Sequence, residues 1–279
     1  MMSHEIKLLF LVKKTRVLML LFSILFLTFS CFRDPVNLDL SEYGPNIVIE
    51  GSISNRPGPH SVRITKTVAY NGRNNFPAVS GADVSITDNL GNSVVLQETA
   101  AGLYQTQNFA GQPERTYTLS VLTDGKKYSA TSTLPLPLIM KTIDFTRIAP
   151  GIDVYELSFS FQDHPGIEDY CMINIYNNGD KYDHFLYQDK STDGEEVVFD
   201  DINGQFYYGS VITIELITID RAGYEFYNSI EMINDKEEDD EIVGNFVPVT
   251  TFNPTTNLNN GALGYFGANA IGIYTRTVN

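Results

Sequence analysis

The feature that most constrains the fold of this chain is a repeated alternation of apolar and polar residues. In YTLSVLT (117–123), Tyr117, Leu119 and Val121 would share one face of an extended strand, and the residues between them would take the other face. Turn sequences such as TDNLGN (87–92), in which an Asn or Asp next to Gly tolerates positive φ, separate such runs. The pattern therefore predicts a mainly β chain built from hairpins.

The alternating runs of the N-terminal part predict a β-sandwich over residues 46–134, of immunoglobulin-like or transthyretin-like type. The runs are IVIEGSIS, SVRITKTV, DVSITD, SVVLQE, GLYQT, YTLSVLT and KYSATSTL. LPLPL (134–138) then interrupts the series, and proline cannot donate a hydrogen bond to a sheet. We therefore expect residues 135–140 to be a proline-rich connector between two domains.

A second series of strands predicts a C-terminal, fibronectin type III-like sandwich over residues 141–279. Its runs are VYELSFSFQ, the hairpin YCMINIYNNGDKYDHFLY, EEVVFDDI and SVITIELITID. The last part of the chain is rich in glycine and aromatic residues and carries one charge, so we expect IGIYTRTV (271–278) to return to a sheet. The two series together predict two tandem β-sandwich domains.

One short helix is expected in this second domain. AGYEFYNSIEMIN (222–234) places Phe226 and Ile230 on one helical face, and the helix would begin near Asp220. The acidic run EMINDKEEDDE (231–241) follows, and its composition is typical of a solvated loop.

The first residues have the pattern of an export signal. A basic head precedes an uncharged apolar run, which is shorter than the about 20 residues of a membrane-spanning helix. LFLTFSC ends at Cys31 and resembles a lipobox, so residues 1–30 are expected to be a lipoprotein signal peptide. Residues 31–45 would then be an acylated cysteine and a polar tether, with the acyl chains holding the protein on a membrane. The alternative is an ordinary signal peptide with an incidental cysteine.

Charge and cysteine content exclude several functions. The chain has a formal net charge of −15, which argues against nucleic acid as a partner because phosphates would be repelled. Apart from Cys31 the only cysteine is Cys171, which lies in an apolar strand-like run. We interpret Cys171 as a small buried hydrophobic residue and not as a nucleophile.

The sequence predicts no catalytic residues. His60, His164 and His184 have no second ligand at the spacing of a zinc site. No serine-hydrolase elbow, P-loop or dinucleotide fingerprint occurs, so we expect a protein that is not an enzyme and needs no cofactor. A hydrolase whose carboxylates meet only in space is a remote alternative.

The sharpest chemical candidate is a calcium loop in DKSTDGEEVVFD (189–200). The oxygen-bearing residues that fall at positions 1, 3, 5 and 12 of such a loop are Asp189, Ser191, Asp193 and Asp200. Against calcium, the residue at position 8 is acidic and strands flank the loop. The competing interpretation is a Thr-Asp-Gly turn between two strands.

Exposed aromatic side chains are the other candidate binding surface. Tyr207, Tyr208 and Tyr265 lie beside glycines or other aromatic residues, and such rings stack on sugars in binding modules. The alternative is that these tyrosines are half-buried strand residues that pack in the core.

Several segments together resemble the Bacteroidota lipoprotein family known as domain of unknown function 4249. After the lipobox and the acidic tether, the best matching pieces are GSISNRPGPHSVRI, GADVSITD, LPLPL and GALGYFGA, and the resemblance covers essentially the whole mature chain. It implies a lipid-anchored protein of the outer membrane, on the periplasmic or the cell-surface side, associated with TonB-dependent receptors. It supplies no catalytic residues.

The expected function is thus that of a non-catalytic accessory protein, anchored to the outer membrane by acyl chains and docked on a receptor or another protein. The main alternative is a surface module that binds glycan or peptide.

Overall fold

The structure is a computed structural model that describes residues 45–68, 76–190, 193–240 and 253–279. The predicted signal peptide, Cys31 and nearly all of the tether lie outside these residues. The described part is mainly β, with sheets in a sandwich-like arrangement and one helix, as the sequence predicts. Within this part no helix combines the length and the apolar character needed to span a bilayer.

The described part contains fourteen strands and the helix α2 (Arg221–Asp240). The strands are β1 (Ile47–Ser54), β2 (Ser61–Lys66), β3 (Asp83–Asp88), β4 (Ser93–Ala100), β5 (Leu103–Gln105), β6 (Thr116–Thr123), β7 (Lys126–Thr133), β8 (Ile139–Arg147), β9 (Val154–Gln162), β10 (Tyr170–Asn177), β11 (Asp180–Gln188), β12 (Glu196–Tyr207), β13 (Val211–Ile219) and β14 (Leu263–Thr277).

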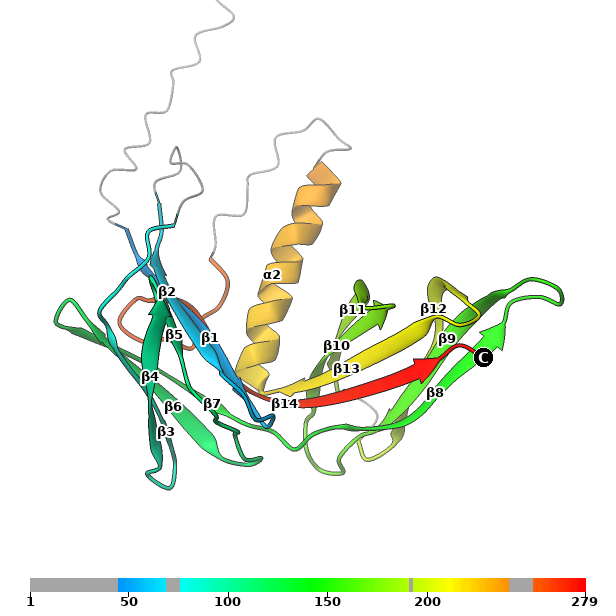
Figure 1. Ribbon diagram of the computed structural model, residues 1–279, viewed down its shortest axis with the longest axis horizontal. Coiled ribbons are helices and arrows are strands. Elements are labelled where there is room, and N and C mark those ends of the chain that lie inside the picture. Colours follow the sequence, from blue (N-terminus) through cyan, green and yellow to red (C-terminus); the bar gives the residue numbers. More distant parts are fainter. Residues whose placement is uncertain (1–44, 69–75, 191–192, 241–252) are drawn as a thin grey trace, which may run out of the picture. The chain divides into compact units, whose positions relative to one another are not determined.

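The strands form one large and one small sheet. The large sheet has the order β11-β10-β13-β14-β1-β2-β5-β4-β3-β6-β7, and the small sheet has the order β12-β9-β8. Strand β14 pairs in parallel with β1 on one side and antiparallel with β13 on the other (Figure 1). The expected return of the C-terminal segment to a sheet is confirmed, and this segment joins strands from both halves of the sequence.

The first hydrophobic core lies among strands of the N-terminal half and β14. Tyr117, Leu119 and Val121 of β6 are all buried in it, which confirms the alternation read from the sequence. Phe266 of β14 is fully buried in the same core. The last strand of the chain is therefore part of the packing of the first ones.

The second core lies between the β10–β13 region of the large sheet and the small sheet. Ile173 and Leu216 face this core from the large sheet, and Leu157 and Phe159 face it from β9. Cys171 is fully buried and its thiol pKa is raised by burial. This confirms its interpretation as a small hydrophobic residue.

The proline-rich segment is anchored to the protein at both of its outer leucines. Leu134 and Leu138 are fully buried. The amide of Leu138 donates to Oγ1 of Thr218 in β13, at 3.1 Å. Strand β8 begins directly afterwards, at Ile139.

Helix α2 begins where the sequence predicts and ends later. Oδ1 of Asp220 accepts a hydrogen bond from the amide of Gly223 at 2.8 Å, so Asp220 is the N-cap. The interpretation of the acidic run as a loop was wrong up to Asp240, because the helix continues through these residues. The run contains no Gly or Pro, and its Glu and Lys residues are good helix formers.

The helix packs through aromatic side chains on the face of the large sheet opposite to the second core. Tyr224 and Tyr227 pack against a cluster formed by Tyr170, Ile217 and Ile219. The helix also leaves one of its edges beside β14 and β1, where a groove opens.

Candidate functional site

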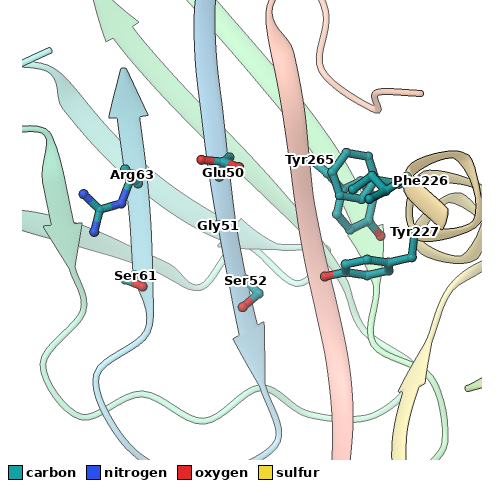
Figure 2. A pocket seen from close by; sticks show the side chains of 9 residues that line it. Glu50, Gly51, Ser52, Ser61, Arg63, Phe226, Tyr227 and Tyr265 are labelled. Carbon is teal, nitrogen blue, oxygen red and sulfur yellow. The ribbon is translucent and has the colours of Figure 1, made fainter. Parts of the chain in front are cut away.

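The main candidate site is a groove of about 460 Å³ between helix α2 and the outer face of strands β1, β2 and β14. Figure 2 shows its lining, with polar side chains on the strands and aromatic rings between β14 and the helix. The lining residues, which we call the groove, are Glu50, Gly51, Ser52, Ser61, Arg63, Phe226, Tyr227, Ile230 and Tyr265.

The strand side of the groove is polar because apolar and polar side chains alternate along β1 and β2, and the polar ones face the groove. Ile49 and Ile53 point into the first core, so Glu50 and Ser52 between them are exposed on the opposite face. Arg63 of β2 lies directly across from Glu50 in the antiparallel register. Among the described residues neither of these two side chains forms a salt bridge, although their charges are opposite.

The helix side of the groove is aromatic. The rings of Phe226 and Tyr265 stack with centroids 4.9 Å apart, and the ring of Tyr227 meets that of Tyr265 edge-on at 6.2 Å (Figure 2). Burial raises the phenol pKa of Tyr227, and the nearby charge of Glu50 raises it further. Tyr227 therefore stays a neutral hydrogen-bond donor beside a carboxylate.

Asp220 fixes the position of the helix against the sheet. In addition to capping α2, its Oδ1 accepts from the hydroxyl of Tyr265 at 2.8 Å. Its Oδ2 accepts from the hydroxyl of Ser132 in β7 at 2.6 Å. One carboxylate thus joins the helix start, β14 and β7, and holds the two walls of the groove at a set distance.

The structure places only one of the three candidate tyrosines at the groove. Tyr265 lines it, although its side chain is largely buried by the stacked ring of Phe226. Tyr207 and Tyr208 are exposed at the end of β12 and do not line the groove. Sequence reasoning missed Glu50 and Arg63, which the β1–β2 hairpin brings opposite each other.

A smaller pocket of about 190 Å³ lies beside the turn after β3, and its charges are already matched inside the protein. Asp88 accepts hydrogen bonds from the side chain and amide of Asn92 and from the amide of Leu90, and forms a 2.8 Å salt bridge with Arg115. These bonds, led by that of the Asn92 side chain, lower the pKa of Asp88. The pocket therefore offers no free charge to a ligand.

The second candidate site is an aspartate cluster (Asp163, Asp189 and Asp193), in which one oxygen of each carboxylate lies within 4.8 Å of the others. The calcium-loop prediction named two of these residues, and Asp163 was missed. Ser191 lies outside the described residues. Asp200 is exposed in β12 and is not part of the cluster.

Asp163 is the buried member that defines this cluster. Its side chain has no exposed surface, and Oδ2 accepts from the amide of Gly194 at 2.9 Å. Burial raises the pKa of Asp163 to about 6, and the neighbouring carboxylates of Asp189 and Asp169 add to the increase.

The three histidines of the described residues lie in different parts of the chain and contact other residues. His60 contacts the carbonyl of Phe109 through Nε2, at 3.0 Å. His164 contacts the carboxylate of Asp169 through Nδ1 at 2.9 Å, and His184 in β11 lies 3.6 Å from Glu231 of the helix.

A comparison with known families places the chain in one of them. The model of a family described as a domain of unknown function, DUF4249, matches residues 33–273, which is most of the chain. The match confirms the resemblance to this domain that the sequence motifs indicate. No curated protein matches the chain.

Proposed function

We propose, from the premise that this chain belongs to the DUF4249 family, that it is a non-catalytic, lipid-anchored accessory protein of the bacterial outer membrane. In this proposal Cys31 carries the acyl chains and the folded part binds a partner of a TonB-dependent receptor system. The leader sequence and the family resemblance support the anchor and the location. The groove supports the binding role.

The observation that carries the proposal is the combination of charges and rings in the groove. Glu50 and Arg63 offer opposite charges on neighbouring strands without a salt bridge to the described residues, next to the half-buried rings of Phe226 and Tyr227. Aromatic residues and arginine are enriched at the energetic centres of protein interfaces. A surface of this kind suits a polypeptide that presents both charged and apolar side chains.

The position of the groove in the sheet decides how a polypeptide would be held. Strand β1 has β14 and β2 on its two sides, and β2 has β1 and β5. Their backbone groups are used in the sheet, so a bound segment cannot add as a further strand here. It would be held by side-chain contacts, with a basic residue on Glu50 and an acidic residue on Arg63.

Recovery of a partner from membranes tests this proposal. The full acylated protein would be purified in mild detergent from its native membranes, as wild type and as Arg63→Glu. We expect the wild type to recover an outer-membrane receptor, and Arg63→Glu to recover about tenfold less of it, because the charge facing the partner is reversed.

The matched control is Lys126→Glu, which makes the same change of charge on an exposed residue of β7 outside the groove. It should recover as much receptor as the wild type. Equal recovery by Arg63→Glu, or no outer-membrane partner with any of the proteins, would contradict the proposal.

Electrophoresis in affinity gels that contain surface polysaccharides tests whether the ligand is a glycan and not a protein. We expect no retardation of the wild type. Retardation that disappears in Tyr227→Ala would overturn the assignment to a protein partner and favour a glycan-binding module.

The anchor has its own test. Metabolic labelling with palmitate should mark the wild type and leave Cys31→Ala unlabelled. A labelled Cys31→Ala protein, or an unlabelled wild type, would remove the anchor from the proposal.

A further inference from the structure

The aspartate cluster lies where two connections of the C-terminal half meet, the one between β9 and β10 and the one between β11 and β12. Asp163 directly follows β9, Asp189 directly follows β11, and Asp193 lies shortly before β12. Asp163 and Asp189 are buried, whereas Asp193 is exposed. The cluster is therefore a polar site that is closed on the protein side and open to solvent on one side.

The hydrogen bonds of the cluster leave one buried oxygen without a partner. Oδ2 of Asp163 accepts from the amide of Gly194, but Oδ1 is buried and has no hydrogen-bond partner in the described part of the chain. Oδ1 of Asp193 accepts from the amide of Gly166. Neither Asp163 nor Asp193 has a salt bridge to a described lysine or arginine.

A buried carboxylate oxygen without a partner is costly, and a second and third carboxylate nearby increase the cost. The neighbouring Asp169 is a further carboxylate that raises the pKa of Asp163, and its Oδ2 already accepts from the amide of His164 and contacts Nδ1 of the same residue. A cation among the three carboxylates would supply the missing partner.

The chemistry of the ligands indicates which cation fits. Carboxylate oxygens bind hard cations, and Ca²⁺ accepts about six to eight oxygens in flexible geometry, including water, whereas Mg²⁺ demands a near-ideal octahedral set. The cluster has one oxygen of each carboxylate within 4.8 Å of the others. We propose that Asp163, Asp189 and Asp193 bind a calcium ion, with water on the open side at Asp193.

This site differs from the calcium loop expected from the sequence. That loop would use Asp200, whereas the structure replaces it with Asp163 from a different connection. The ion would thus join the end of β9 to the segment between β11 and β12. It would stabilise these loops independently of the groove and of any protein partner.

Calcium titration of the full chain, stripped with chelator and kept in detergent, tests the inference. Isothermal calorimetry should show about one calcium per chain, and millimolar calcium should raise the melting temperature by about 5 °C. Magnesium should bind at least tenfold more weakly, because it demands a tighter octahedral set of ligands.

Single-residue variants distinguish calcium binding by the aspartate cluster from calcium binding by the loop expected from the sequence. Asp193→Asn, at an exposed position, should weaken calcium binding by about tenfold or more, and Asp163→Asn should abolish it. Asp200→Asn is the matched control, since it removes a carboxylate of the same acidic stretch outside the cluster, and it should bind calcium like the wild type.

The stability of the protein without calcium shows whether the carboxylate of Asp163 serves to bind a cation or only to support the fold. In chelator, Asp163→Asn should be at least as stable as the wild type, because a neutral amide costs less to bury than a carboxylate. Three results would overturn the inference. The first is a wild type that neither binds calcium nor shifts its melting temperature at 10 mM, about tenfold above the weakest dissociation constants of extracellular modules. The others are magnesium binding as tight as calcium binding, and a loss in Asp200→Asn equal to that in Asp193→Asn.

Discussion

Strands β1, β2 and β14 have an inner face that packs in the core and an outer face that lines the groove. Successive residues of each strand point to these two faces in turn. On the inner face Ile49, Val62 and Phe266 are fully buried in the first core. On the outer face Glu50 and Arg63 are exposed beside the aromatic residues of the helix. A shift of one residue along a strand thus separates positions that hold the fold from positions that are available for recognition.

The largest effect is expected where β14 meets β1, because this pairing supports both faces. Gly264 has φ of 95°, and a Cβ at this position would lie 2.2 Å from the carbonyl oxygen of Ile49. Gly264→Val should lower the free energy of unfolding by about 5 kcal/mol or prevent folding, because backbone must move to admit the side chain. Urea denaturation followed by circular dichroism measures this change.

Gly125→Val is the matched control for Gly264→Val. Gly125 also has positive φ, but nothing lies within 4 Å of an added Cβ. Its cost should be about 2 kcal/mol, from backbone strain alone. Equal costs at the two glycines would show that the close approach of β14 to β1 is not important.

The next largest effect is expected on the inner face. Phe266→Ala should lower the free energy of unfolding by about 4 kcal/mol, since it leaves a cavity in a fully buried position. The same urea titration measures it. A loss of less than about 1 kcal/mol in the free energy of unfolding would mean that the inner face of β14 does not contribute to the packing of the first core.

A smaller effect is expected at the residue that links the two sides of the groove. Asp220→Ala removes the N-cap of α2 and the acceptor for Tyr265 and Ser132, and should cost about 2 kcal/mol. It should also reduce partner recovery, because the helix loses its attachment to the sheet. Asp220→Asn, which can still accept from Gly223, should cost less, and an equal cost would contradict the capping role.

The smallest effect on stability is expected on the outer face. Arg63→Glu should change the free energy of unfolding by no more than about 0.5 kcal/mol, because the side chain is exposed and has no salt bridge to the described residues. The same variant should recover about tenfold less of its partner. Destabilisation comparable to that of Phe266→Ala would place Arg63 among the residues that hold the fold.

Local patterns in the sequence predicted the strands and the start of the helix well. The alternation around Leu119 and the cap at Asp220 depend on neighbours a few residues away, and both are confirmed. The sequence did not predict the end of the helix, because a run of acids is typical of a solvated loop, although Glu also favours helix.

The sequence contains no comparable local pattern that predicts which distant segments pair with each other. The sequence suggested that the C-terminal segment enters a sheet, but not that Tyr265 would lie beside Glu50 of the first strand. Asp163 was missed for the same reason, since it is far in sequence from Asp189 and Asp193 and meets them only in space. The pairing of Arg63 with Glu50 across the hairpin could have been predicted from the sequence, because each residue lies between apolar neighbours in an alternating run.

The most direct test of the central claim, that the groove binds a protein partner, is photo-crosslinking in living cells. A benzophenone amino acid would replace Ser61, which lines the groove, or Val95, which is exposed on β4 outside it. We predict a crosslinked outer-membrane receptor from position 61 and none from position 95. No adduct at position 61, or the same adduct from both positions, would contradict the claim.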